Sequence, residues 1–129
     1  AISILRTAIN QGYNGYLISM ISLLDTLLVL SKGPAEHYLK FENKIRNCPL
    51  LVLDDFGAEY DNKWVGNKVD AIISDRVERG RATIITTNLN VKQIKDGYDS
   101  RIYDRLKSTS FLLKFNGKSK RDPLKISEI

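Results

Sequence analysis

Two adjacent aspartates, Asp54 and Asp55, stand at the end of the apolar run "LLVLDD", residues 50–55. Two like charges side by side repel each other, so this position favours a positive partner such as a metal ion. A carboxylate at the end of a buried strand can hold hydrated Mg²⁺, which prefers oxygen ligands and keeps several waters. The neighbouring carboxylate can then orient or deprotonate an attacking water. The alternative is that Asp55 only caps the following turn, and the pair by itself does not decide between the two.

Asn88 ends a second apolar and β-branched run, "ATIITTN", residues 82–88. In a parallel sheet the carboxyl ends of the strands meet at one edge, and ligands bind at that edge. We therefore expect Asn88 to lie near Asp54 and Asp55, where its amide could position a water against a phosphoryl group. Together the three residues predict phosphoryl-transfer chemistry at one edge of a sheet.

Helical and strand patterns alternate along the chain, and they predict the framework that positions these residues. Apolar residues at helical spacing, with glycine or proline at the ends, predict helices over 1–12, 21–31, 35–47, 63–79, 91–95 and 100–108. Apolar and β-branched runs predict strands over 16–19, 50–54, 82–88 and 110–115. Strands that are apolar throughout and separated by helices indicate an α/β fold, with a parallel sheet covered by helices on both faces.

The length and composition indicate a single domain over residues 1–129. A chain of 129 residues with 43% hydrophobic content is large enough for one core. Cys48 is the one cysteine, so no disulfide can form within the chain, which is consistent with a cytoplasmic protein. Polar residues interrupt the longest apolar region, residues 16–30, which is too polar and too short to span a membrane.

The excess positive charge lies at the C-terminal end of the chain. Residues 101–129 hold eight basic and three acidic side chains, whereas residues 1–100 hold twelve of each. The basic residues include Arg101, Arg105, Lys107, Lys114, Lys118, Lys120 and Arg121. Such a patch could bind the phosphates of a nucleotide or of a nucleic acid. The alternative is a lysine-rich surface that contacts only solvent.

Four segments, "LLVLDDFGAE", "DRVERGRATIITTNLN", "SRIYDRL" and "FNGKSKR", occur in this order along the chain. Together they resemble the helicase-loader branch of the AAA+ ATPases, the DnaC and DnaI type, and its relatives the IstB-like transposition ATPases. The resemblance covers nearly the whole chain and implies a P-loop NTPase fold, ATPase activity, and ATP and Mg²⁺ as cofactors. It further implies self-association, with a replicative helicase and single-stranded DNA as partners.

The resemblance also implies roles for individual residues. Asp54 matches the Walker B position, which holds magnesium through water, and Asp55 matches the position that polarises the hydrolytic water. Asn88 matches the polar sensor of the terminal phosphate. Arg105 in "SRIYDRL" matches the arginine finger, which would act on nucleotide bound by a neighbouring subunit.

Two further arginines are candidates for nucleotide contacts. Arg101, one helical turn before Arg105, is the nearest rival for the finger, or it could instead form an ion pair with Asp104. Arg121 in "FNGKSKR" could approach the nucleotide of its own chain or contact DNA. It could equally belong to a solvated basic tail, residues 116–129.

The phosphate-binding loop of this family does not occur in the sequence. No G-x-x-x-x-G-K-[ST] segment is present, so the backbone N–H groups and lysine that would surround the phosphates are missing. The resemblance implies a strand order of 5-1-4-3-2, and loss of the central first strand would leave its neighbours about 9–10 Å apart. We therefore expect the 129 residues to be the C-terminal portion of a longer AAA+ ATPase core, inactive on their own.

Two classes of function are consistent with these features. The first is an ATP-dependent helicase loader for DNA replication, which couples ATP binding and hydrolysis to helicase delivery and single-stranded DNA binding. A transposition helper ATPase of the IstB type is a further candidate within that class. The second class is a non-hydrolysing interaction module that binds and inhibits a host helicase loader or helicase. A glycine-rich loop ending in Lys-Thr or Lys-Ser in the complete protein would favour the first class.

Overall fold

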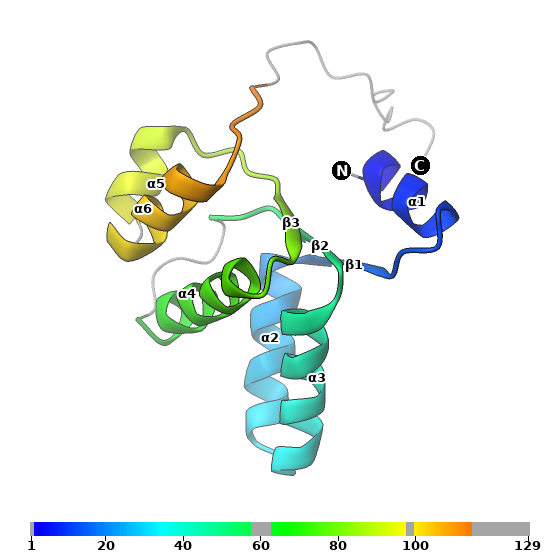
Figure 1. Ribbon diagram of the computed structural model, residues 1–129. Helices are drawn as coiled ribbons and strands as arrows, with labels where there is room; N and C mark the ends of the chain where they lie inside the picture. The colour runs from blue at the N-terminus through cyan, green and yellow to red at the C-terminus, as the bar shows by residue number, and fades with distance from the viewer. Residues whose placement is uncertain (1, 58–62, 98–99, 115–129) are drawn as a thin grey trace, which may run out of the picture.

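The protein alternates helices and strands around one small sheet, as the sequence predicted (Figure 1). A computed structural model describes residues 2–57, 63–97 and 100–114. The elements in chain order are α1 Ile2–Asn10, β1 Gly15–Ser19, α2 Met20–Ser31, α3 Ala35–Asn47, β2 Leu50–Asp54, α4 Lys63–Glu78, β3 Ala82–Ile85, α5 Val91–Gly97 and α6 Ser100–Thr109. None of the helices in these ranges has the length and apolar character needed to cross a membrane.

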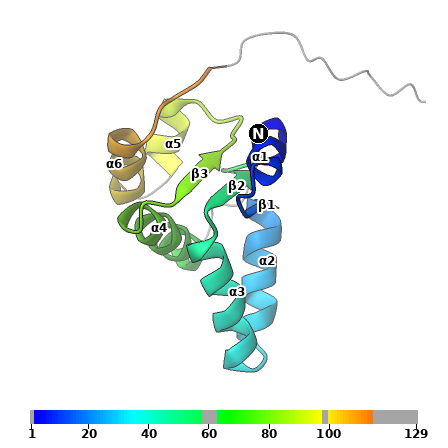
Figure 2. The ribbon, with the colours of Figure 1, turned by 45° about the vertical axis from the view of Figure 1, so that its right-hand side comes forward.

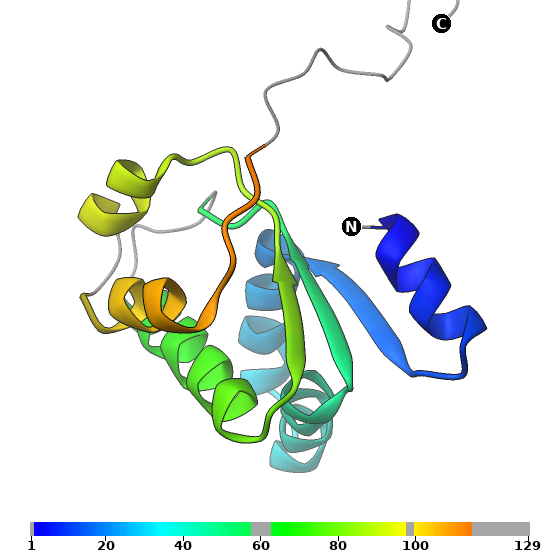
Figure 3. The same ribbon diagram turned by 45° about the horizontal axis from the view of Figure 1, so that its top comes forward.

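The sheet is parallel, with the order β1-β2-β3 in the described part of the chain (Figure 3). In the register, Ile18 of β1 pairs with Leu53 of β2, and Leu53 pairs with Ile85 of β3. β2 is the middle strand, and its first four residues are all buried. Because all three strands run in the same direction, their carboxyl ends lie at one edge of the sheet, where β2 ends at Asp54.

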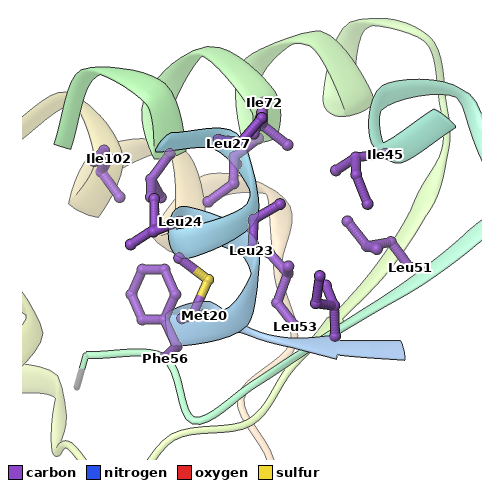
Figure 4. Packing of buried hydrophobic residues seen from close by; sticks show 13 residues of the cluster. Met20, Leu23, Leu24, Leu27, Ile45, Leu51, Leu53, Phe56, Ile72 and Ile102 are labelled. Atoms are coloured by element: carbon purple, nitrogen blue, oxygen red, sulfur yellow. The ribbon is translucent and has the colours of Figure 1, made fainter. Parts of the chain in front are cut away.

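The hydrophobic core lies on one face of the sheet, between β2 and the helices α2, α3, α4 and α6 (Figure 4). β2 contributes Leu51 and Leu53, and α2 contributes Met20, Leu23, Leu24 and Leu27. Each fully buried aliphatic side chain of this kind stabilises the fold by about 1.5–3 kcal/mol. The core therefore holds β2, the strand that delivers both aspartates, in a fixed position.

The helix α1 lies on the opposite face, over β1. Gly15 pairs with Leu50, and neighbouring residues of a strand face opposite sides of the sheet. Leu50 and the Cα–H of Gly15 therefore face the side away from Leu51. A Cβ added at Gly15 would lie 2.3 Å from Cδ1 of Leu5, which shows how closely α1 approaches this strand. Helices therefore lie on both faces of the sheet, as the sequence predicted.

The helices α2 and α3 form a hairpin that extends beyond the sheet (Figures 1 and 2). Ser19 accepts a hydrogen bond from the backbone N–H of Ser22 and caps the start of α2. The turn between the two helices contains Gly33 and Pro34, which end one helix and begin the next. Leu23, Leu27 and Ile45 of the hairpin pack in the hydrophobic core.

A fully buried arginine joins α4 to the amino-terminal ends of β2 and β3. Arg76 is 0% exposed. Its guanidinium group donates hydrogen bonds to the carbonyl oxygens of Ile45 (2.8 Å), Cys48 (2.9 Å) and Ala82 (2.6 Å), and to the hydroxyl of Thr83 (2.8 Å). Burial lowers the pKa of Arg76, an effect opposed by the nearby Cys48 sulfur, but an arginine stays charged in proteins. The charge is tolerated because its donors are bonded to protein oxygens.

The predicted strand over 110–115 is wrong for the residues that the structure describes. Residues 110–114 follow α6 without strand structure, and Phe111, Leu112 and Leu113 are 98%, 70% and 74% exposed. A strand needs a neighbour for its backbone hydrogen bonds. The strand order implied by the resemblance separates this segment from β3 by one further strand, and no such strand occurs among the described residues. Phe115 lies outside the described residues.

Candidate active site

The predicted metal-binding residue Asp54 and the predicted catalytic residues Asp55 and Asn88 lie at or shortly after the ends of two adjacent strands. Asp54 is the last residue of β2 and is half-buried, and Asp55 follows it and is exposed. Asn88 lies three residues after the end of β3 and is exposed. Because β2 and β3 are parallel neighbours, the structure places these residues at the same edge of the sheet. We call residues 54–57 and 86–89 together the rim.

Hydroxyl groups connect the two segments of the rim. The Thr86 hydroxyl donates a hydrogen bond to Oδ1 of Asp54 and accepts one from the backbone N–H of Asp55 (3.2 Å). The Thr87 hydroxyl donates to the carbonyl oxygen of Phe56 (2.6 Å) and accepts from the N–H of Leu89 (3.0 Å). The two threonines therefore fix the segment that carries the aspartates against the segment that carries Asn88.

Asp55 has an unusual backbone conformation, with φ at +57°, in the left-handed region that side chains other than glycine rarely adopt. Such a conformation costs about 1–3 kcal/mol and persists only where the surroundings enforce it. The next residue, Phe56, is 2% exposed and its ring packs into the core near Met20 (Figure 4). The buried ring holds the chain on one side of Asp55, and β2 holds it on the other.

Gly57 allows the two segments of the rim to approach each other closely. Its φ is +101°, and a Cβ at this position would lie 2.1 Å from Cδ1 of Leu89. Any side chain at residue 57 would both strain the backbone and displace Leu89. The glycine after "LLVLDDF" is therefore required by the geometry of the rim.

The two carboxylates of the rim have no positive partner within the described residues, where neither Asp54 nor Asp55 forms an ion pair. Those residues also contain no cluster of three or more His, Cys, Asp or Glu side chains around a common point. Mg²⁺ is commonly bound through one or two carboxylates, with water and substrate phosphates completing its shell. Two uncompensated carboxylates at an open edge fit that pattern, and they do not fit a metal site built from protein ligands alone.

Arg105, the predicted arginine finger, is held against its own chain. It lies on α6, and its Nε is 4.0 Å from Oδ1 of Asp70 on α4. Both atoms are buried, and neither has a hydrogen-bond partner in the part of the chain that the structure describes. A separation of 4.0 Å is too long for a hydrogen bond, so the attraction of opposite charges is only partly used. Asp70 was not predictable from the sequence as the partner of Arg105, because the two residues lie far apart in the chain.

The remaining predicted arginines are Arg101 and Arg121. Arg101 is exposed on α6. Arg121 and the basic tail, residues 116–129, lie outside the described residues. The structure also places Thr86 and Thr87 in the site, two residues that the sequence pattern indicated only as strand formers. The sequence pattern that could have identified them is the pair of hydroxyl-bearing residues directly before Asn88, at the end of a strand.

The arrangement of the sheet matches solved structures of known proteins. The chain superposes on the DnaC helicase loader with a TM-score of 0.75 and 25% identity, covering 87% of this chain and 67% of that one. It superposes on DnaI with a TM-score of 0.69 and 21% identity, covering 84% and 61%. The replication initiator DnaA, bound to AMPPCP and single-stranded DNA, gives a TM-score of 0.73 and 17% identity, covering 82% and 32%. The chain thus spans about a third of DnaA. No curated protein sequence matches it.

These matches define the class of protein. The three parallel strands flanked by helices form part of a P-loop NTPase fold of the kind seen in DnaC and DnaA. Residues 1–127 match the family model described as IstB-like ATP binding protein. The chain therefore belongs to the IstB-like ATP-binding family, which is of the AAA+ ATPase kind. The resemblance to helicase loaders and their IstB-like relatives is confirmed at the level of the family.

Proposed function

We propose that this chain supplies the Walker B and sensor part of an ATP-dependent helicase loader, which couples ATP hydrolysis to helicase delivery on single-stranded DNA. The observation that carries the proposal is the rim, where Asp54 and Asp55 have no positive partner among the described residues. The Asp54 carboxylate and the backbone N–H of Asp55 are hydrogen-bonded to Thr86, in the segment that contains Asn88. Membership of the IstB-like ATP-binding family supports nucleotide as the ligand of this edge. The fold match to the DnaC helicase loader supports helicase loading as the process.

In this proposal three residues of the rim have defined tasks. Asp54 holds hydrated Mg²⁺, and Asp55 orients and polarises the attacking water. Asn88 positions that water and the terminal phosphate. Mg²⁺ bound with ATP supplies positive charge that offsets the negative charge developing on the transferred phosphoryl group. The exposure of Asp55 and the half-buried position of Asp54 are consistent with a ligand that arrives from solvent.

The phosphate-binding loop has to come from sequence other than these 129 residues, which contain no G-x-x-x-x-G-K-[ST] segment. We therefore propose the activity for a complete protein in which such a loop lies next to the rim, and we expect the 129 residues by themselves to be inactive. Without the loop, the backbone N–H groups that bind the β- and γ-phosphates are missing.

Arg105 is proposed to act on nucleotide bound by a neighbouring copy of the chain. Its attachment to Asp70 is loose, since the closest atoms are 4.0 Å apart and lack hydrogen bonds in the described residues. Because this interaction is weak, little free energy is lost when the arginine leaves Asp70. A phosphate in its place would accept several charge-assisted hydrogen bonds. Self-association would then bring a positive charge to the phosphates bound at each rim.

The partners in this proposal are a replicative helicase and single-stranded DNA. One structural match, DnaA, is itself bound to single-stranded DNA. In this chain the exposed basic residues around the end of α6, including Lys107 and Lys114, would provide phosphate contacts. Such binding would weaken as the salt concentration rises, because each phosphate contact releases counterions.

A transposition helper ATPase is the second candidate, favoured by the family match over residues 1–127. Both candidates share the rim, so the rim cannot distinguish them. The experiment that does so presents the complete protein with either a replicative helicase or a transposase, and measures ATP turnover and transfer to single-stranded DNA. Stimulation by the helicase supports the loader, whereas stimulation by the transposase alone supports the second candidate.

Failure to bind or hydrolyse ATP would contradict both candidates. The complete protein would then fit the non-hydrolysing module that binds a helicase loader or helicase and blocks it. Helicase binding without nucleotide, measured by analytical ultracentrifugation, would identify that outcome.

A further inference from the structure

One residue of the rim, Thr86, forms hydrogen bonds with four consecutive residues, 53–56, at the end of β2 and directly after it. Its backbone N–H donates to the carbonyl oxygen of Leu53 (3.0 Å), and its carbonyl oxygen accepts from the N–H of Phe56 (2.8 Å). Its hydroxyl donates to Oδ1 of Asp54 and accepts from the N–H of Asp55 (3.2 Å). The backbone bonds would form with any residue other than proline, but the two hydroxyl bonds need this side chain.

The hydroxyl acts as donor and acceptor at the same time, which few side chains of this size can do. By donating to Oδ1, it fixes the orientation of the Asp54 carboxylate, whose Oδ2 has no hydrogen-bond partner in the described residues. By accepting from the N–H of Asp55, it satisfies a backbone donor in the residue whose φ is +57°. One group therefore supports both the direction of the first aspartate and the strained backbone of the second.

We propose that Thr86 is a positioning residue for the magnesium site, holding Asp54 and Asp55 in the geometry in which they bind Mg²⁺ and orient water. This inference rests on the proposed function of the rim as a nucleotide site. Side chains that bond to metal-binding carboxylates typically change metal affinity or activity by about 10–100-fold when they are removed. Thr86 would act through the aspartates and would not itself touch the nucleotide.

The decisive comparison is between Thr86→Val and Thr86→Ser in the complete protein. Valine keeps the branched shape and removes the hydroxyl, whereas serine keeps the hydroxyl. The matched control is Thr83→Val. Thr83 lies near the start of β3, whereas Thr86 directly follows that strand, and the Thr83 hydroxyl accepts from Arg76 (2.8 Å) and does not contact the rim. Titration of Mg²⁺ into protein saturated with AMPPCP, followed by calorimetry, measures the metal affinity without turnover.

We expect Thr86→Val to weaken the Mg²⁺ affinity about 10–100-fold, and Thr86→Ser to restore it to within about threefold of the wild type, because the donor and acceptor return. Thr83→Val should lower the melting temperature and leave the Mg²⁺ affinity unchanged. If Thr86→Val does not fold, Thr86→Ala repeats the comparison without placing a new methyl group beside the aspartates.

Amide hydrogen exchange gives a second readout that needs neither metal nor nucleotide. In Thr86→Val the N–H of Asp55 loses its partner and should exchange faster. The N–H of Phe56 is the internal control, because it bonds to the backbone oxygen of residue 86 and should stay protected. Faster exchange at both amides would indicate general loosening of the rim and would contradict a specific role of the hydroxyl.

The outcomes separate this inference from the function on which it rests. Equal Mg²⁺ affinity in the wild type and in Thr86→Val would overturn the role of Thr86 and leave the nucleotide site intact. Absence of AMPPCP binding by the wild-type protein would overturn the proposed function and, with it, this role. A loss of affinity in Thr86→Val that Thr86→Ser does not recover would also overturn it, since the hydroxyl would not be the cause.

Discussion

The charged side chains at the two ends of the strands β2 and β3 differ in sign and in whether protein groups satisfy them. At the amino-terminal end, the positive Arg76 is completely buried and bonded to Ile45, Cys48, Ala82 and Thr83. At the carboxyl end, Asp54 and Asp55 carry two negative charges with no ion-pair partner among the described residues, and Asp55 has a strained backbone. At one end protein groups satisfy the buried charge, and at the other no described residue forms an ion pair with the two carboxylates.

This difference distinguishes a stabilising site from a binding site. A buried charge is compatible with folding only if protein groups satisfy it, which is what surrounds Arg76. Carboxylates left without partners at an open edge contribute repulsion in the absence of a ligand, and that repulsion is relieved when a cation binds. The amino-terminal end therefore fixes the strands, and the carboxyl end is where the proposed function places Mg²⁺ and phosphates.

The largest expected effect belongs to Arg105. This prediction tests whether a neighbouring copy of the chain supplies positive charge to the nucleotide at the rim. Arg105→Ala should lower the ATP turnover of the assembled protein by about 10³- to 10⁵-fold, while ATP still binds. Mixing this variant with an Asp55→Asn variant should restore part of the turnover, because some sites then combine an intact Arg105 with an intact Asp55. Turnover is measured by phosphate release.

The control for Arg105 is Asp70→Asn, which removes the partner of Arg105 within the chain. If Arg105 mattered only through this ion pair, the two variants would lose the same turnover. We expect Asp70→Asn to keep most of it, since the arginine remains free to reach a neighbouring nucleotide. Equal losses would contradict the finger.

The second prediction concerns the rim itself. Asp55→Asn should lower turnover by about 10²- to 10⁴-fold, because an amide cannot accept the proton of the attacking water. Nucleotide binding, measured by calorimetry with AMPPCP, should remain close to that of the wild type. The matched control is Asp25→Asn, an exposed aspartate on α2. Unchanged hydrolysis in Asp55→Asn would contradict the role assigned to this residue.

The third prediction concerns the amino-terminal end. Arg76→Met should lower the free energy of unfolding by about 3–5 kcal/mol, because it leaves several buried carbonyl oxygens without donors. Arg79→Met is the control, since Arg79 lies one turn later on the surface, with 49% of its side chain exposed, and bonds to Asp75. The control should change the free energy by about 1 kcal/mol or less. Urea denaturation measures both, and equal effects would contradict the comparison.

The smallest expected effect concerns the ion pairs that Asp75 forms with Arg79 and with Arg46 of α3. A hydrogen bond from the Arg79 guanidinium lowers the pKa of Asp75 below its ordinary value of 3.8, with burial opposing and Arg46 adding to the effect. A lowered pKa means that the native state favours the charged carboxylate. Asp75 should therefore stabilise the protein above pH 3.8 and lose this contribution as the pH falls through the lowered value.

Comparison of Asp75→Asn with the wild type measures this contribution. The variant should be the less stable of the two at pH 7, and the difference should shrink in acid. Asp25→Asn, without an ion pair among the described residues, should show no such trend. A difference between the Asp75 variant and the wild type that grows as the pH falls would contradict the assigned ion pairs.

Much of the fold follows from local patterns in the sequence. The core strand β2 is apolar without interruption, and the helices that flank it have apolar residues at helical spacing, so the alternation of elements was predictable. The predicted strand over 110–115 failed for residues 110–114, because strand formation depends on a neighbouring backbone and not on apolar content alone. The match in family confirmed the class that the four segments indicated.

The candidate site was predictable only in part. Asp54, Asp55 and Asn88 could be placed at one edge, since parallel neighbouring strands bring their carboxyl ends together. The bonds of the Thr86 hydroxyl could not be predicted, because they join residues 31 and 32 positions apart in the chain. The hydrogen bond of Arg76 to Ile45 and the pairing of Arg105 with Asp70 could not be predicted for the same reason.

By itself the sequence determined the order of helices and strands as far as α6, the pair of acids at the end of β2, and the lack of a phosphate-binding segment within these residues. These are properties of residue type and of spacing over a few positions. Only the tertiary structure decided which charges are satisfied and which are not, because the partners of a charged group come from distant parts of the chain. It enclosed Arg76 in carbonyl oxygens and left Asp54 and Asp55 without a cation among the described residues.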